Sequence, residues 1–301
     1  ILDTDIGGDI DDTWALALLL KCPELDVKLI TTATADTVYR AKITAKFLQE
    51  AGRSDIPIGI GLRQNSDGPR ERQAKWVEDY ELSNYPGKIH EDGIRALCDA
   101  IKSSDEQLTL ISIGPLPNLA EAIKRDNSFS KNIHFCGMHG SFGMHHKTNL
   151  YLSMDKGAIP EWNVKSDINA AKTVFSAEWR DFTITPLDTC AWIVLDGELY
   201  KRCANSNDKM MKMVIENYKI WSPRDSWKEK SDPEKHSSVL FDTVAVFLAF
   251  STEFIKMEKM KVSVNDEGYT VRDDKGINAN IAIEWNDLDG YKRWLVDRLL
   301  S

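Results

Sequence analysis

Short hydrophobic segments alternate with longer amphipathic segments along much of the chain. The short segments are rich in β-branched and aliphatic residues, which is typical of strands. They are residues 27–33, 56–60, 108–113 and 132–136. Between them, residues 38–51 and 116–124 carry apolar side chains at helical spacing. This alternation predicts βαβ units, and so an α/β fold with an open, mainly parallel, doubly wound (Rossmann-like) sheet flanked by helices.

Three polar stretches interrupt the alternation, at residues 63–87, 205–236 and 261–285. The last contains the turn sequences Asn-Asp-Glu-Gly and Asp-Asp-Lys-Gly, and it therefore predicts hairpins. No internal repeat, low-complexity tract or linker separates one part of the chain from another. We therefore expect a single domain over residues 1–301, with helical and hairpin insertions. In such sheets the active site lies beyond the carboxyl ends of the strands.

Composition narrows the function. The chain has 301 residues, of which 42% are hydrophobic and 28% charged, and its formal net charge is −9. This acidity argues against a nucleic-acid partner, because duplex binding needs a basic face. No apolar run approaches the roughly 20 residues that span a bilayer, and the five scattered cysteines indicate reduced thiols. We expect a cytoplasmic enzyme with a small-molecule substrate, although a start without Met is compatible with a removed leader.

The N-terminal segment has the clearest chemistry. Five aspartates fall within ten residues, directly after a strand-like start and directly before the apolar helix predicted at residues 14–20. Carboxylates packed this closely repel one another unless a cation neutralises them, and oxygen ligands suit a hard ion such as Ca²⁺ or Mg²⁺. Capping of a helix N-terminus explains one such aspartate, not five. An EF-hand is excluded because its glutamate at the twelfth position and its leading helix are missing.

This segment resembles the signature of the inosine–uridine-preferring nucleoside hydrolases, Asp-Thr-Asp-x-Gly followed by Asp-Asp and an apolar helix, with a slightly longer loop. The resemblance implies that Asp5 and Asp12 are ligands of Ca²⁺, the expected cofactor. It makes Asp11 the general base and Asp3 a supporting carboxylate behind the ligands. Asp9 belongs to the longer loop and receives no role.

Three later segments resemble the same family, in family order. Gly-Pro-Leu-Pro-Asn follows Ile113, whose carbonyl oxygen would be a further calcium ligand. Glu-Trp-Asn at residues 161–163 resembles a sugar-binding segment, in which Glu161 and Asn163 would bind ribose hydroxyls. Phe-Asp-Thr-Val-Ala resembles the C-terminal motif, in which Asp242 would be the third calcium carboxylate. The combination is more specific than any of its parts.

Several positions depart from the family pattern. Phe241 stands where many purine-cleaving members have a histidine that is thought to protonate the leaving base, so the leaving group needs no acid there or receives one from elsewhere. His90 is the best substitute acid. Asp36 falls where the family usually has Asn near the sugar, and it can accept but not donate a hydrogen bond once it is ionised. Asp155 falls where an Asn would contact the 5′-hydroxyl.

Two tryptophans in the polar stretch at residues 205–236 remain open to two interpretations. Trp221 and Trp227 would bind substrate if they stack on the base, and they would be structural if they pack beneath a loop. His139, together with two neighbouring histidines at residues 145 and 146, lies in an apparent insertion. No cysteine or carboxylate at suitable spacing completes a zinc site there, which favours a loop that lines the substrate.

The sequence therefore predicts a Ca²⁺-dependent enzyme of nucleoside catabolism or salvage, which hydrolyses the N-glycosidic bond of a ribonucleoside or related N-riboside. Two alternatives remain at this point. One is a haloacid-dehalogenase-like, Mg²⁺-dependent phosphatase, which also begins with Asp-x-Asp after a first strand. The other is a non-catalytic nucleoside- or ribose-binding module. The family resemblance implies a homodimer or homotetramer, and we expect no membrane partner.

Overall fold

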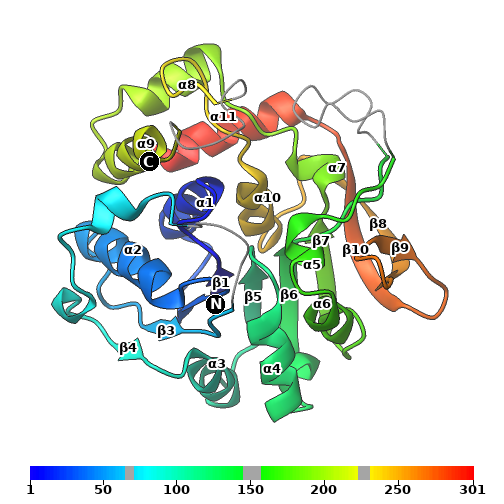
Figure 1. Cartoon of the computed structure of the whole chain (residues 1–301). Coiled ribbons are helices and arrows are strands. Elements are labelled where there is room, and N and C mark those ends of the chain that lie inside the picture. Colours follow the sequence, from blue (N-terminus) through cyan, green and yellow to red (C-terminus); the bar gives the residue numbers. More distant parts are fainter. Residues whose placement is uncertain (65–70, 145–156, 223–230) are drawn as a thin grey trace.

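One twisted sheet runs through the centre of the molecule (Figure 1). The computed structural model describes residues 1–64, 71–144, 157–222 and 231–301. Over these residues the sheet has ten strands, in the order β4-β3-β2-β1-β5-β6-β7-β10-β8-β9. Their bounds are β1 Leu2–Thr4, β2 Ile30–Thr32, β3 Ile58–Ile60, β4 Ile89–His90, β5 Leu108–Ser112, β6 Ile133–Met138, β7 Asp181–Thr185, β8 Ile255–Val264, β9 Thr270–Arg272 and β10 Ile277–Trp285.

The sheet is mainly parallel, as the sequence predicts. Strands β1 to β7 pair in parallel, and β10 joins β7 in the same direction. Among the described strands, β8 runs against the others and is antiparallel to both β10 and β9. The first predicted turn closes a β8–β9 hairpin at one edge. The second leads from β9 to β10, which pairs with β8 and not with β9, so the second predicted hairpin is wrong. In the turn between β8 and β9, the N–H of Gly268 donates to the carbonyl of Asn265 at 3.2 Å. Gly268 has a φ of +79°, which glycine adopts readily.

Helices cover both faces of the sheet (Figure 1). The α-helices are α1 Asp11–Lys21, α2 Thr37–Glu50, α3 Gly93–Lys102, α4 Pro117–Arg125, α5 Trp162–Lys165, α6 Ile168–Val174, α7 Leu187–Cys190, α8 Gly197–Ala204, α9 Lys209–Trp221, α10 Phe241–Leu248 and α11 Leu288–Leu299. Three short 3₁₀ segments are η1 Ala74–Val77, η2 Leu82–Asn84 and η3 Phe129–Asn132. None of the described helices combines the length and the apolar character needed to cross a membrane.

The predicted elements lie where the sequence places them, with shifted ends. The helix expected at residues 38–51 is α2, and the one at 116–124 is α4. The strand expected at residues 27–33 shortens to β2, because only residues 30–32 pair with both β1 and β3. The polar stretch at residues 205–236 contains α9, whose Met211, Val214 and Tyr218 are buried.

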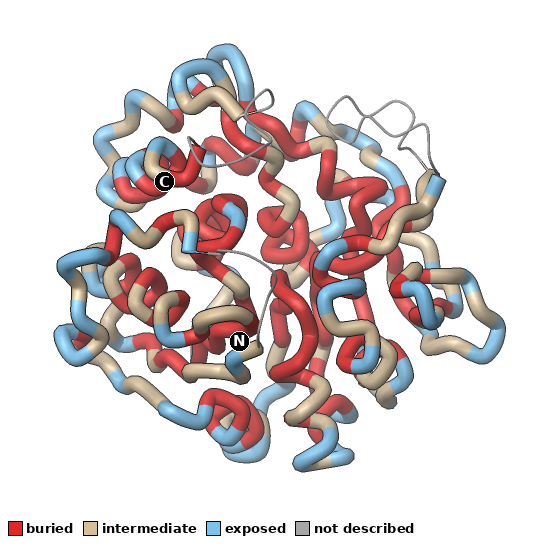
Figure 2. Tube along the Cα trace, viewed as in Figure 1, coloured by how far each residue is buried: buried red, intermediate tan, exposed pale blue. Residues whose placement is uncertain are grey.

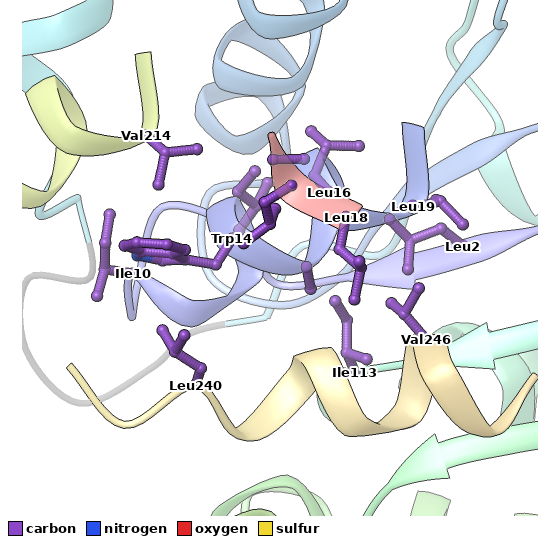
Figure 3. Close-up of a cluster of buried hydrophobic side chains, with 14 of the residues drawn as sticks. Leu2, Ile10, Trp14, Leu16, Leu18, Leu19, Ile113, Val214, Leu240 and Val246 are labelled. Carbon is purple, nitrogen blue, oxygen red and sulfur yellow. The ribbon is translucent and has the colours of Figure 1, made fainter. Parts of the chain in front are cut away.

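Two hydrophobic cores lie on opposite faces of the sheet, and Figure 2 shows the buried inner sides of the helices. The larger core joins β1, β5 and β6 to α1, α9, α10 and α11. Figure 3 shows part of it, with Leu18 of α1 and Val246 of α10 beside Ile113. Each Å² of apolar surface that is buried in this core stabilises the fold by roughly 25 cal/mol. The packing therefore fixes the position of α1 relative to α10.

The direction in which the chain winds reverses between β1 and β5. From β1 the chain builds β2, β3 and β4 on one side, and it then crosses to build β5, β6 and β7 on the other. In a doubly wound sheet, the carboxyl edge at such a reversal is where ligands bind. The acidic loop, which begins at Asp5, follows β1 at this point.

Candidate active site

The acidic loop connects β1 to α1 by a sharp turn. Gly7 has a φ of +96°, and a Cβ atom there would lie 2.7 Å from Cδ1 of Ile43 and 2.8 Å from Cε1 of Tyr39. Only glycine therefore fits this turn without a shift in α2. Asp5 stands at the start of the loop. Asp11 and Asp12 form the first turn of α1, where carboxylates also interact favourably with the helix dipole.

Asp242 reaches the same point from the other end of the chain. It lies in the first turn of α10, which packs beside α1 (Figure 1). Asp11, Asp12 and Asp242 each offer a carboxylate oxygen within 4.8 Å of the other two. Their exposed fractions are only 4%, 2% and 3%. Three carboxylates buried this close together would be unstable as three free anions, because burial and mutual repulsion both oppose their ionisation.

The pKa values of all three carboxyl groups are raised, as this repulsion requires. Burial raises the pKa of Asp11 well above its ordinary value, and the nearby charges of Asp9 and Asp5 raise it further. Burial and repulsion from Asp11 likewise raise the pKa of Asp242, and the two carboxyl groups hydrogen-bond to each other. The pKa of Asp12 is raised by burial and by Asp5 and Asp11. A cation would relieve this repulsion by replacing the protons.

The donor set fits a hard divalent cation. Asp11, Asp12 and Asp242 offer only oxygen atoms, which Ca²⁺ and Mg²⁺ prefer and which do not favour zinc. Asp5 lies beside this cluster, because its charge acts on all three carboxyl groups. Gly114, which follows Ile113, comes so close that a Cβ atom there would lie 3.0 Å from Oδ1 of Asp5. The end of β5 is thus within reach of the acidic loop.

Behind the cluster, buried polar groups fix its backbone and side chains. The hydroxyl of Thr4 donates to Oδ1 of Asp12. Oδ1 of Asp3 accepts from Nδ2 of Asn118 at 2.8 Å and from the hydroxyl of Thr31. Burial raises the pKa of Asp3 to about 7. The N–H of Ile113 donates to the carbonyl of Asp3 at 2.9 Å, which ties the end of β5 to β1.

Glu161 and Asn163 lie at the start of α5 and are nearly buried, with 3% and 6% exposed. Glu161 accepts from the N–H groups of Asn163, Val164 and Gly140, at 2.7, 3.2 and 3.1 Å. Burial raises its pKa to about 7 in spite of these donors. Nδ2 of Asn163 donates to the carbonyl of Met138 at 3.0 Å and contacts that of Ile113 at 3.4 Å. Both side chains therefore touch loops that follow β5 and β6.

Asp36 and His90 belong to other elements than the three clustered carboxylates. Asp36 caps α2 by accepting from the N–H groups of Val38 and Tyr39, and it forms an ion pair with Arg63 at 3.4 Å. His90 ends β4, three strands from β1, or roughly 14 Å across the sheet at a strand spacing of about 4.8 Å. Its role as an acid stays a prediction. Phe241 immediately precedes Asp242 in α10 and is partly exposed.

The structure describes Trp221 and His139, but not the other residues singled out in the same two segments. Trp221 is only 2% exposed, and its indole N–H donates to the carbonyl of Gly8 at 3.2 Å. This favours the interpretation that it packs beneath the acidic loop. His139 is fully buried, its Nε2 bonds the carbonyl of Gly114 at 3.1 Å, and burial lowers its pKa to about 4. It does not line an open site. Trp227 and Asp155 lie outside the described residues.

Sequence reasoning missed three buried residues that organise the site. Asn118 accepts from the N–H of Leu62 and donates to Asp3 and to the carbonyl of Thr32. Asp188 accepts from the N–H groups of Phe142 and Met144. Arg40 is 1% exposed and bonds both the acidic loop and the loop after β2. Two of them carried a signal, because Asn118 ends the Gly-Pro-Leu-Pro-Asn motif and Arg40 shares the buried face of its helix with Phe47.

Comparisons with known proteins agree with this geometry. The family model for inosine-uridine preferring nucleoside hydrolases matches residues 1–293. The non-specific ribonucleoside hydrolase RihC of Salmonella paratyphi B is 27% identical over 318 residues, with 99% of this chain and 96% of that protein covered. Uridine nucleosidase 1 of Arabidopsis thaliana is 27% identical over 284 residues, with 90% and 79% covered.

Solved structures show the same fold. The plant nucleoside hydrolase PpNRh1 aligns over 100% of this chain and 98% of its own, with a TM-score of 0.80 and 21% identity. The purine-preferring ribonucleoside hydrolase from Gardnerella vaginalis aligns over 99% and 96%, with a TM-score of 0.79 and 20% identity. Neither the phosphatase nor the non-catalytic alternative is favoured by these matches.

Proposed function

This chain belongs to the inosine-uridine preferring nucleoside hydrolase family and is an N-glycosyl hydrolase, and we propose that it uses Ca²⁺ and Asp11 to release the base from a ribonucleoside. The observation that carries the proposal is the buried meeting of Asp11 and Asp12 with Asp242. Carboxylates from positions 11 and 242 of the chain repel each other when both are ionised, and a divalent cation bound between them would offset that repulsion.

In this proposal Asp5, Asp12, Asp242 and the carbonyl oxygen of Ile113 hold the cation. When bound, the ion supplies Lewis acidity, which makes a water more acidic and orients the sugar hydroxyls. The resulting charge balance favours the site, because one divalent ion offsets two of the closely packed carboxylates. Oxygen ligands that are partly supplied by a loop suit the flexible coordination of Ca²⁺ better than the strict octahedron of Mg²⁺.

Asp11 acts as the general base. Once a cation offsets the charges of its neighbours, Asp11 is ionised and its carboxylate can accept a proton from water. As water attacks the anomeric carbon, Asp11 takes its proton, the C–N bond breaks, and the base leaves with the bonding electrons. The geometry of this displacement resembles that of an inverting glycosidase, in which one carboxylate activates water. No covalent sugar–enzyme intermediate is formed.

Glu161 and Asn163 bind the ribose. The amide nitrogen of Asn163 is occupied by the carbonyl of Met138, so its oxygen is the atom that it offers to a sugar hydroxyl. Glu161 accepts backbone hydrogen bonds on both carboxylate oxygens, which fixes its orientation and leaves lone pairs for a hydroxyl donor. Contacts that strengthen in the transition state contribute about 2–4 kcal/mol each.

Phe241 bears on the leaving group. A phenyl ring beside Asp242 cannot donate a proton to a purine, so we propose a substrate whose base leaves without an acid at this position. His90, Asp36 and the undescribed Asp155 and Trp227 remain proposed substrate contacts on the strength of the family resemblance alone. The same resemblance supports a homodimer or homotetramer.

A nucleoside panel with and without EDTA tests the proposal. Inosine, adenosine, guanosine, uridine, cytidine and 4-nitrophenyl riboside are incubated with the protein, and free base and free ribose are both measured. We expect equal amounts of base and ribose, loss of turnover in EDTA, and recovery with Ca²⁺ in preference to Mg²⁺. The nitrophenyl riboside should give the highest kcat/KM, because its leaving group needs no proton. Turnover that is indifferent to EDTA would contradict the metal's role, and binding without ribose release would contradict hydrolysis.

A further inference from the structure

Arg40 is a buried cation on the inner face of α2, next to the acidic loop. It is 1% exposed, although a guanidinium remains charged at every physiological pH and is costly to bury. A buried arginine persists only where its donors are occupied by acceptors of matching geometry. The role of Arg40 should therefore follow from the groups that it contacts.

Those groups come from two different loops. Nη1 of Arg40 donates to the carbonyl of Ile6 at 2.8 Å, and Nη2 lies 3.6 Å from Oδ2 of Asp5. Both acceptors belong to the acidic loop after β1. On its other side, Nε donates to the carbonyl of Thr34 at 2.9 Å, in the loop after β2. One rigid guanidinium thus connects two neighbouring loops at the carboxyl edge of the sheet.

The loop after β2 is strained. Thr34 and Ala35 have φ angles of +62° and +47°, which residues other than glycine rarely adopt. Such residues cost on the order of 1–3 kcal/mol each, and they persist only where their surroundings hold them. Here the N–H of Thr34 donates to the carbonyl of Leu62 at 3.2 Å, and its carbonyl accepts from Arg40. Asp36, the N-cap of α2, follows directly.

The charge of Arg40 also matters to the cluster. Asp5, Asp11, Asp12 and Asp242 would carry four negative charges if all were ionised, and a single divalent ion offsets two. Arg40 supplies a third positive charge that cannot dissociate, and its nearness favours the ionised form of Asp12. The guanidinium also lies beside the backbone of the acidic loop, since a Cβ atom on Gly8 would be in van der Waals contact with Nη1, at 3.4 Å.

We propose that Arg40 is a positioning residue that holds Asp5 and the strained turn at residues 34–36 in one fixed arrangement, so that the cation site and the adjoining wall of the sugar site are built together. This inference rests on the proposed function, because it assumes that Asp5 serves the cation. It assigns to Arg40 no contact with substrate. Partners behind metal ligands typically change metal affinity or activity by 10–100-fold when they are removed.

The decisive variant is Arg40→Lys, which keeps the charge but loses the fork that reaches both loops. Ca²⁺ affinity is measured by titration calorimetry on protein stripped with EDTA, and kcat and KM are measured on the best nucleoside of the panel. We expect the Kd for Ca²⁺ to rise about tenfold or more, with KM rising as kcat falls. Arg40→Met, which also loses the charge, should show a larger loss in both measurements.

Phe47→Leu is the matched control. Phe47 is buried on the same face of α2 but contacts Trp76 rather than either loop. It should lower the melting temperature while leaving the Kd for Ca²⁺ within twofold of wild type. A merely structural Arg40 would behave in the same way. An Arg40→Lys protein with wild-type Kd and wild-type KM would therefore overturn the proposal.

Two further outcomes are separable. If Arg40→Lys does not fold, it is combined with Ala35→Gly, which relieves the strain of a φ of +47° and leaves the contacts of the guanidinium as the variable. We expect the same rise in the Kd for Ca²⁺, and an unchanged Kd and KM would overturn the proposal. If wild-type protein binds no divalent ion, the proposed function itself fails and the role of Arg40 fails with it. A wild type that binds Ca²⁺ beside an unaffected variant removes only the role of Arg40.

Discussion

Buried carboxylates at the same edge of the sheet have two opposite environments. In the acidic centre, Asp11, Asp12 and Asp242 face one another within 4.8 Å. Beyond β7, Asp188 is equally buried, but it accepts from the backbone N–H groups of Phe142 and Met144. One group is held against repulsion and the other is satisfied by the backbone. Glu161 lies between these cases, with three backbone donors and a raised pKa.

This difference distinguishes the carboxylates that we propose to act in the reaction from a carboxylate that stabilises the fold. A buried anion that is fully hydrogen-bonded stabilises the loop that supplies its donors. A set of buried anions without enough donors costs stability, and it persists because the packing of α1 against α10 holds it in place. The acidic centre therefore depends on something that the described chain does not provide, and the Asp188 loop does not.

The largest expected effect is on turnover in the acidic centre. Asp11→Asn should lower kcat about 10³–10⁴-fold, because general base catalysis contributes up to that amount and the amide cannot take a proton. KM should change little. Steady-state release of ribose measures both parameters. Asp9→Asn is the control, since it removes a charge from the same loop at an exposed position and should cost less than tenfold. Wild-type turnover in Asp11→Asn would show that another group is the base.

The acidic centre could be predicted because its members occupy recognisable positions in the sequence. Asp11 and Asp12 follow a strand and begin an apolar helix. Asp242 also begins an apolar helix, where a lone aspartate is normally a cap, and it was assigned to the centre by the family resemblance. The contacts of Asp188 were not predictable, since it accepts from backbone N–H groups that are 44 and 46 residues away along the chain. Contacts of this kind are set by how loops approach one another, which local pattern does not encode.

The elements of the fold were predictable for a similar reason. Period and turn chemistry are local, so β5, α2 and the β8–β9 hairpin lie where the pattern places them. The pairing of β10 with β8 across β9 was not predictable, because it is not set by the turn before β10. The burial of Trp221 was not predictable, because an aromatic residue in a polar stretch fits a lid, an interface or a core equally well. Arg40 was visible as a charge on an apolar helix face, but the identity of its acceptors was not.

The second prediction concerns pH. Because burial raises the pKa of Asp3 to about 7, above the ordinary 3.8, the folded metal-free protein binds this proton more tightly than the unfolded chain does. That stabilisation is complete below about pH 4 and is lost as the pH rises through 7. At about 1.4 kcal/mol per pKa unit, Asp3 alone should remove about 2–3 kcal/mol between pH 5 and 8.

Urea unfolding of EDTA-treated protein measures this slope, and Asp3→Asn should reduce it by the share of Asp3, since the raised pKa values of the acidic cluster contribute in the same direction. Added Ca²⁺ should stabilise the protein more at pH 8 than at pH 5, since the raised pKa values of Asp11, Asp12 and Asp242 mean that the ion must displace protons. Metal-free protein that is more stable at pH 8 than at pH 5 would contradict the prediction that buried carboxyl groups of the acidic region bind protons more tightly in the folded state.

The smallest effect should come from the satisfied region. Asp188→Asn replaces one acceptor oxygen with a donor that faces the N–H of Phe142 or Met144, so one buried donor loses its partner. This should cost about 1–3 kcal/mol of the free energy of unfolding. The Kd for Ca²⁺ should remain within twofold, because Asp188 lies outside the acidic cluster.

The matched change Asp242→Asn should do the reverse, and stabilise metal-free protein by relieving repulsion while abolishing tight Ca²⁺ binding. If both variants lost stability and Ca²⁺ affinity together, the two groups of carboxylates would form one cooperative network, and the division between chemistry and scaffold would be wrong.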